Sequence, residues 1–216
     1  VWNNSPDALL CPSNDGIPHK NGRHTAYAFC LGDQVENVND STEVRGLFAR
    51  NTTYTFADIT DGTSNTIAMS EQIVQDRGGV GDNGSDYTTQ RDGEVEHVKA
   101  ITTAVGGLAA APINCRATTD GKYYRANRPV NSRRGVKWTF GPSIYVAFNT
   151  VLPPNDPSCA ETQNGWGWDN NVALPPSSRH PGGVNCLFAD GSVRFISQTI
   201  DTGNLAAYQP PRGSSV

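Results

Sequence analysis

The sequence lacks any run of about 20 apolar residues, so no helix is predicted to cross a bilayer. It begins Val-Trp-Asn and shows no signal-peptide pattern. Hydrophobic residues make up only 36% of the chain and charged residues only 18%, whereas glycine (22) and proline (14) are numerous. This composition indicates a loop-rich β domain outside the cytoplasm and disfavours a helix bundle.

Basic charge is also scarce, and the formal net charge of the 216 residues is −4. This balance argues against a nucleic-acid-binding surface, because no stripe of lysine and arginine offsets it. The one dense basic group comprises Arg125, Arg128, Arg133, Arg134 and Lys137. We interpret this group as a solvated loop or a partner contact rather than as a phosphate site.

Catalytic motifs are missing as well. The sequence contains no Gly-x-Ser-x-Gly and no Ser-x-x-Lys, and the glycines at 78–81 lack the helix and lysine of a phosphate loop. His19 and His24 stand five apart without the His-Glu-x-x-His or Cys-x-x-Cys spacing of a zinc site. We therefore predict that the protein is not an enzyme and needs no cofactor, with Ca²⁺ as the one candidate exception.

The candidate calcium site is an Asp-Asn-Gly-Ser-Asp loop. Asp82, Asn83 and Asp86 place oxygen ligands around a glycine, which is how loops that bind hard cations are built. The stretch lacks the terminal glutamate of an EF-hand, although Asp92 or Glu94 could take that role. A solvated acidic loop is the favoured interpretation, because such short patterns recur by chance.

Trp166 and Trp168 lie in a loop rich in glycine and asparagine, next to Asp169. Aromatic faces beside amides and a carboxylate suit the binding of carbohydrate, so these three residues form a candidate ligand site. Aromatic side chains in glycine-rich loops also fix such loops to the core. We weigh this second interpretation slightly above the first.

Five cysteines constrain the fold. An odd number in an exported protein indicates two disulfides and one free thiol. Cys186 lies within a predicted strand and is expected to be a small buried hydrophobe, which leaves the pairs Cys11–Cys30 and Cys115–Cys159. The alternatives are a fully reduced chain and a bond to a cysteine outside this sequence.

A β-hairpin is predicted at residues 184–196, where two runs rich in apolar residues flank Asp190-Gly191. This dipeptide favours a type I′ turn. His180 precedes the first strand, and His180 with Asp190 is the most obvious chemical pair of the chain. We favour structural roles for both, with Asp190 in the turn and His180 hydrogen-bonded to backbone groups. Acid–base or metal-binding roles are the alternative.

The hairpin is expected to bury one of its faces, because side chains alternate along each strand. From the first strand we expect Leu187 or Phe188 in the core. From the second strand we expect Val193 or Phe195 there.

The expected fold is an α+β domain built on a twisted antiparallel β-sheet, with long loops and the hairpin near its C-terminal end. Further strands are expected at residues 25–29, 66–73, 137–140 and 145–150, with a helical turn at 56–59 and a short helix at 97–108. One domain spans residues 1–216, with a loop-rich insertion around 77–135. No repeat or heptad period is present, which excludes solenoids and coiled coils.

Four separated blocks carry a family resemblance. Residues 9–14 read Leu-Leu-Cys-Pro-Ser-Asn, and residues 58–67 read Asp-Ile-Thr-Asp-Gly-Thr-Ser-Asn-Thr-Ile, followed by Glu71. Residues 152–159 read Leu-Pro-Pro-Asn-Asp-Pro-Ser-Cys, and residues 180–191 show a His-x9-Asp-Gly signature. In this order the blocks resemble a large, mostly planctomycetal family of prepilin-like surface proteins, domain-of-unknown-function family fifteen-fifty-nine.

The resemblance implies the head of a pilin- or pseudopilin-like structural protein, exposed on the cell surface, in the periplasm or secreted. Members usually begin with a prepilin leader and a long apolar helix, whereas this chain has neither, and Asn14 replaces the usual acid. We therefore expect a head cut from its anchor, whose filament formation or contact with other secretion-system subunits depends on the missing helix. Some pseudopilin heads hold calcium, in line with the loop at Asp82. A glycan-binding module that uses Trp166 and Trp168 is the alternative function.

Overall fold

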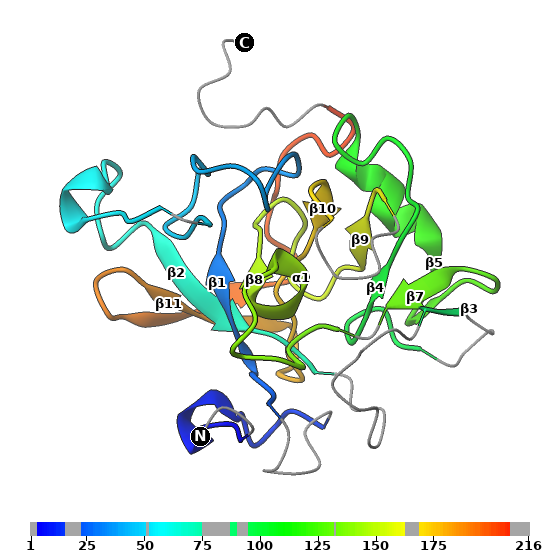
Figure 1. Cartoon of the computed structure of the whole chain (residues 1–216), viewed down its shortest axis with the longest axis horizontal. Coiled ribbons are helices and arrows are strands. Elements are labelled where there is room, and N and C mark those ends of the chain that lie inside the picture. The colour runs from blue at the N-terminus through cyan, green and yellow to red at the C-terminus, as the bar shows by residue number, and fades with distance from the viewer. Residues whose placement is uncertain are drawn as a thin grey trace.

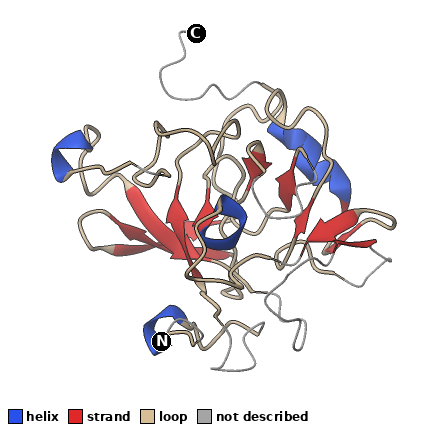
Figure 2. Cartoon of the chain, viewed as in Figure 1, coloured by secondary structure: helices blue, strands red, loops and turns tan. Residues whose placement is uncertain are grey.

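The structure is a computed structural model whose described residues are 4–15, 23–50, 52–74, 87–89, 95–131, 133–162 and 169–207. Most of the regular structure is β, in two five-stranded sheets that lie side by side and one two-stranded ribbon (Figures 1 and 2). The helices are short, so the predicted α+β class with a strand-dominated domain is confirmed. Within the described ranges, no helix has the length and apolar character needed to cross a membrane.

The first sheet has the strand order β12–β11–β2–β1–β8. Its strands are β1 (Tyr27–Cys30), β2 (Ile67–Glu71), β8 (Ala147–Phe148), β11 (Gly183–Phe188) and β12 (Val193–Ser197). All neighbours pair antiparallel except β1 and β8, which are parallel. The strands predicted at 25–29 and 66–73 are thus present, in a sheet that is mixed rather than wholly antiparallel.

The second sheet has the order β10–β9–β4–β7–β3. Its strands are β3 (Tyr87–Thr89), β4 (Ile101–Thr102), β7 (Pro129–Asn131), β9 (Ser158–Ala160) and β10 (Val172–Ala173). The separate ribbon pairs β5 (Thr119–Asp120) with β6 (Tyr123–Tyr124). The segment around 77–135, predicted to be rich in loops, therefore supplies three strands of this sheet, and its β4 pairs in parallel with β9.

Among the described residues, the helical elements are three 3-10 helices and one α-helical turn: η1 (Asp7–Leu9), η2 (Phe56–Asp58), η3 (Pro112–Thr118) and α1 (Ser143–Val146). The turn predicted at 56–59 is confirmed by η2. The helix predicted at 97–108 is wrong, because β4 lies inside this segment. Ala104 (φ +57°) and Gly107 (φ +68°) also have left-handed backbone, which a right-handed helix does not accommodate.

Two predicted strands are corrected. In the segment 145–150, the first two residues end α1 and only Ala147–Phe148 are extended. In the segment 137–140, Lys137 makes an isolated bridge with Arg23, and the N–H of Phe140 donates to the Lys137 carbonyl (3.2 Å), which closes a turn. Local β propensity is overridden in both segments by the tertiary structure.

The core covers both faces of the second sheet. One buried cluster contains Ile101 of β4 together with Ile144 of α1. A second cluster contains Cys159 of β9 with Leu108 and Leu152. Ala160 lies next to Cys159 on β9 but belongs to the first cluster. Because neighbouring residues of a strand point to opposite faces, the two clusters lie on the two sides of the same sheet.

The predicted disulfide Cys115–Cys159 is present, with a Cα–Cα distance of 5.8 Å. The predicted pair Cys11–Cys30 is wrong, because both thiols are free. Cys11 lies beside Tyr27 at the start of β1. Cys30 ends that strand three residues later, about 10 Å away and on the opposite face, which is too far for a bond.

The C-terminal hairpin is confirmed, since β11 and β12 pair antiparallel and Cys186 is buried and free. Its turn is not the predicted type I′, because Gly191 has a positive φ (+85°) and Asp190 does not. The N–H of Phe188 donates to the carbonyl of Ser192 (2.8 Å). The loop is therefore the three-residue form, in which glycine takes the left-handed position.

The two faces of the hairpin differ in burial. Phe188 is buried as predicted, and Ile196 packs against its cluster. Val193 and Phe195 are 65% and 51% exposed, so the prediction that one of them enters the core is wrong. Alternation places both on the outer face of β12, where Val193 lies opposite Leu187 of β11.

Candidate functional site

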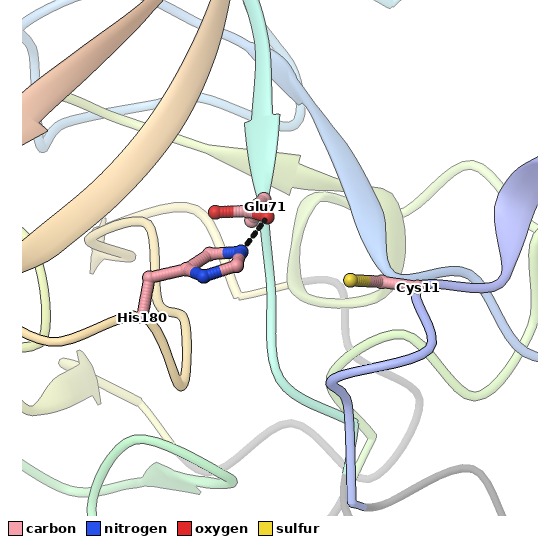
Figure 3. Close-up of side chains that lie close together, drawn as sticks. All are labelled: Cys11, Glu71 and His180. Atoms are coloured by element: carbon pink, nitrogen blue, oxygen red, sulfur yellow. Dashed lines mark hydrogen bonds and ion pairs between the residues drawn. The ribbon is translucent and has the colours of Figure 1, made fainter.

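Three side chains with metal-binding or catalytic chemistry meet at one end of the first sheet: Cys11, Glu71 and His180. Their donor atoms, one from each residue, all lie within 4.8 Å of one another. Cys11 follows η1, Glu71 ends β2 and His180 precedes β11, and the three side chains point toward one another (Figure 3). Residues far apart in the sequence thus form one cluster.

Glu71 is buried, with both carboxylate oxygens in contact with partners. Its Oε1 lies 3.0 Å from Nε2 of His180, and its Oε2 accepts a hydrogen bond from the backbone N–H of Asn185 (2.8 Å). These contacts offset the cost of burying a carboxylate at the end of β2. Tyr27 lies opposite Glu71 on β1. Burial and then the neighbouring Cys11 and Glu71 raise the pKa of Tyr27.

The side chain of His180 is 38% exposed, and its Nε2 is the atom that contacts Glu71. Its backbone N–H donates to Oγ of Ser178 (3.0 Å). The preceding segment is tied to the end of β2, because the N–H of Ser177 donates to the Glu71 carbonyl (3.1 Å) and its Oγ accepts from the N–H of Ile73 (2.9 Å). His180 was predicted to hydrogen-bond backbone groups, but its Nε2 contacts a carboxylate instead.

The thiol of Cys11 is half-buried, and its Sγ lies 3.0 Å from Oγ of Ser13. The following residue, Asn14, is buried and fixes this segment to the chain after β2. Its side-chain amide donates to the carbonyl of Gln72 (2.8 Å), and its Oδ1 accepts from the N–H of Val74 (3.3 Å). The Cys11 segment is therefore held at the same end of β2 as Glu71.

An ion-pair network beside the site joins the same parts of the chain. Arg179 binds Asp15 through two hydrogen bonds (3.1 and 3.0 Å) and Glu96 through a third (2.6 Å). Lys122 also pairs with Glu96 (2.8 Å). Burial opposes the ionisation of Asp15 and Glu96, but the hydrogen bonds from Arg179 and neighbouring lysines outweigh it. The pKa of both carboxyls therefore lies below its ordinary value.

The cluster offers one thiol sulfur, one imidazole nitrogen and one carboxylate oxygen. A cysteine nucleophile activated by histidine needs the thiol at one ring nitrogen and the orienting group at the other. Here Nε2 of His180 contacts Glu71, and the same edge of the ring faces Cys11 (Figure 3). The arrangement therefore resembles ligands that share one ion more closely than a nucleophile–base pair.

Asp190 and Gly191 are not part of this cluster. They follow the six-residue strand β11, whose length of about 20 Å separates them from His180. Asp190 accepts hydrogen bonds from the N–H (2.9 Å) and the hydroxyl (2.6 Å) of Ser192, which lower the pKa of its carboxyl. The His-x9-Asp-Gly signature thus marks the two ends of one strand.

Most residues of the candidate calcium and carbohydrate sites lie outside the described residues: Asp82, Asn83, Asp86, Trp166 and Trp168. Asp169 is described and is 1% exposed. Its Oδ1 accepts a hydrogen bond from the hydroxyl of Thr162 (2.6 Å). The carboxylate of Asp169 therefore does not face solvent, where a glycan would bind.

The basic group predicted to be a solvated loop is partly inside the protein. Arg133 and Arg134 are 3% and 1% exposed. Arg134 donates to the carbonyls of Ala147 (3.1 Å) and Pro175 (3.2 Å), and burial lowers its pKa to about 10. The prediction is wrong for these two arginines, and Arg134 links separate segments of the chain.

Sequence reasoning missed two of the three clustered residues. Cys11 was expected in a disulfide, and Glu71 was noted only as the end of a block. A signal was nevertheless present, since Cys11, Glu71 and His180 belong to three of the four blocks that carry the family resemblance.

Comparison with known proteins identifies a family without supplying an activity. Neither the curated proteins nor the solved structures give a match to this chain. A family match extends over residues 3–203, a range that includes Cys11, Glu71 and His180. The chain therefore belongs to the family described as "Protein of unknown function (DUF1559)".

Proposed function

We propose that this chain is the head of a pilin- or pseudopilin-like structural protein, located at the cell surface or secreted, and that it is not an enzyme. The observation that carries the proposal is an apolar row on the outer face of the first sheet. The row consists of Phe29, Met69, Leu187 and Val193, which lie in register across four strands. Phe29 is 38% exposed and Val193 is 65% exposed.

An exposed apolar row of this kind suits a helix packed across the strands. Three strand spacings of about 4.8 Å give a row of about 14 Å, which corresponds to about ten residues of α-helix. Phe48 enlarges the apolar surface, with its ring centroid 4.8 Å from that of Phe29. Contiguous exposed apolar surface marks interaction sites. An apolar helix of the same subunit or of a neighbour in an assembly would bury this row.

Two further observations support the proposal. The disulfide Cys115–Cys159 favours a location outside the cytoplasm, because thiols are kept reduced inside it. Glu71 contacts His180 and accepts a hydrogen bond from the backbone N–H of Asn185. These contacts hold the start of β11 in place, which is a structural role.

The test uses Met69, the one methionine of the chain, which lies within the apolar row. A ¹³C-methyl label on Met69 is compared between this chain and the full gene product, with Met69→Leu to identify its signal. We expect the resonance to shift, and peroxide oxidation of the thioether to slow, in the longer protein. An unchanged resonance and oxidation rate, or an upstream region without an apolar helix, would contradict the proposal.

A further inference from the structure

We propose that Cys11, Glu71 and His180 are three ligands of a Zn²⁺ site whose fourth position is open to water. The proposal does not depend on a pilin-like role, because the apolar row that carries that role contains none of these three residues. The ligands come from three separate segments, which explains why no zinc motif is visible in the sequence.

The spacing of the donor atoms fits a single ion. Tetrahedral zinc with bonds of about 2.3 Å to sulfur and about 2.0–2.2 Å to nitrogen and oxygen places its donors roughly 3.5 Å apart. In the structure, Nε2 of His180 and Oε1 of Glu71 are 3.0 Å apart, and all three donors lie within 4.8 Å of one another. Relative to the upper limit of 4.8 Å, the Cys11 sulfur has to move by roughly 1 Å to reach the tetrahedral spacing.

The chemistry of the donors selects zinc. Ca²⁺ and Mg²⁺ take oxygen ligands, whereas a set of one sulfur, one nitrogen and one oxygen suits a softer divalent ion. A zinc-bound thiol is deprotonated, so binding at Cys11 releases a proton. The thiolate and the Glu71 carboxylate then balance the two charges of the ion. A neutral complex suits a site in which Glu71 is 7% exposed.

The ligands are held in place by contacts outside the donor set. The N–H of Asn185 occupies Oε2 of Glu71, which leaves Oε1 directed at His180. Oγ of Ser13 lies 3.0 Å from the Cys11 sulfur. Such outer contacts orient metal ligands. In the part of the chain that the structure describes, no fourth His, Cys, Asp or Glu joins the group, and water can reach the partly exposed ring of His180.

A bound ion joins three parts of the chain that are otherwise connected by hydrogen bonds and ion pairs. It links the N-terminal segment at Cys11, the end of β2 at Glu71 and the entry to β11 at His180. Because zinc binds the folded site and not the unfolded chain, it stabilises the protein by linkage. Coordination also keeps the Cys11 thiol from oxidation.

The test titrates the metal-free chain with Co²⁺, whose thiolate complexes absorb in the near ultraviolet, and then displaces Co²⁺ with Zn²⁺. We expect one Co²⁺ per chain with a thiolate charge-transfer band that Zn²⁺ removes. Cys11→Ser should abolish the band and weaken Zn²⁺ binding at least about a hundredfold. His180→Gln, which can still hydrogen-bond Glu71, should weaken binding by a similar factor. Ser13→Ala removes only an outer contact and should weaken binding about tenfold.

Cys186→Ala is the matched control, because Cys186 is also a free thiol but lies outside the cluster. It should keep both the band and the affinity. Thermal unfolding of every variant without metal separates loss of binding from loss of folding. Zn²⁺ should raise the Tm of the wild type and of Cys186→Ala but not of Cys11→Ser. A thiolate band that survives Cys11→Ser, unchanged affinity in His180→Gln, or no Co²⁺ uptake by the folded wild type overturns the proposal.

Discussion

The two five-stranded sheets of this protein differ in how their faces are covered. In the second sheet, every residue of β4, β9 and β10 is buried, so side chains are covered on both sides. In the first sheet burial alternates, and the exposed Phe29 lies between the buried Ala28 and Cys30 on β1. The difference indicates that these strands of the second sheet lie within the core, whereas the first sheet leaves one face partly exposed. That exposed face is the one to which we assign the proposed interactions.

The outer surface carries two adjacent rows, the apolar row and a mixed row in which polar groups lie beside Phe195, the residue opposite Asn185. The apolar row ends at Phe29 and Val193, and the adjacent row contains Tyr27 opposite Glu71, with Asn185 hydrogen-bonded to the carboxylate. A partner that covers the apolar row would therefore lie beside the cluster of Cys11, Glu71 and His180. The surface role and the metal site, although independent proposals, concern neighbouring parts of one face.

The largest effect is expected from the disulfide that anchors β9 of the second sheet. Replacing both Cys115 and Cys159 by alanine should lower the free energy of unfolding by about 4 kcal/mol, because the bond closes a loop with a sequence separation of 44. Cys186→Ala in the first sheet breaks no disulfide and should lower the free energy of unfolding by about 1 kcal/mol. Urea unfolding of both variants measures the contrast. Equal losses of unfolding free energy in the two variants would contradict the expected difference between the two sheets.

A core substitution in the second sheet should have the next largest effect. Ile101 is fully buried, and Ile101→Ala should cost about 3 kcal/mol through lost burial and the cavity left behind. The same measurement on Phe195→Ala, in the outer face of β12, should show a loss below about 1 kcal/mol. A larger loss for Phe195 than for Ile101 would mean that the outer face belongs to the core.

The ion-pair network should make stability depend on pH in the acid range. The pKa of Asp15 and of Glu96 is lowered in the folded state, so their contribution is present above the unfolded pKa of about 4 and is lost as the pH falls through the folded values. Arg179→Ala should lower the free energy of unfolding by about 1 kcal/mol or less at neutral pH. Stability should then fall less steeply than in the wild type as the pH is lowered.

Thermal unfolding from neutral pH to about pH 3 measures the slope of stability against pH. Arg50→Ala is the control, because Arg50 pairs with Asp40 on the surface, away from this network. The control should keep the wild-type slope. An Arg179→Ala variant with that same slope would show that the network does not govern the acid response.

The smallest effect on stability is expected in the apolar row. Val193→Ser should change the free energy of unfolding of this chain by less than about 0.5 kcal/mol, since the side chain is 65% exposed. In the full gene product, the same substitution should weaken assembly, which sedimentation of the longer protein measures. Unchanged assembly would show that the apolar row does not take part in the proposed surface role.

Parts of the fold could be predicted because their signals are local. The hairpin has an Asp-Gly dipeptide between two strand-like runs, and β1 and β2 are rich in apolar residues with strand propensity. The strands β4, β9 and β10 have only two or three residues each, too few to show a period. Their extended conformation depends on pairing with distant segments, which sequence patterns do not reveal.

The outer face of β12 shows a second limit. Val193 and Phe195 have the same hydrophobicity as core residues, so composition could not place them in solvent. The cluster shows a third limit, since Cys11, Glu71 and His180 meet only through the pairing of β2 with β11 and the packing of the N-terminal segment. Glu71, Val193 and Phe195, whose positions the sequence did not reveal, all lie on the outer face of the first sheet.

X-ray absorption at the zinc edge of the zinc-loaded chain tests most directly whether Cys11, Glu71 and His180 form one metal site. We predict one sulfur scatterer at about 2.3 Å and three nitrogen or oxygen scatterers at about 2.0–2.2 Å, with the sulfur lost in Cys11→Ser. A first shell of nitrogen and oxygen alone in the wild type would contradict the site.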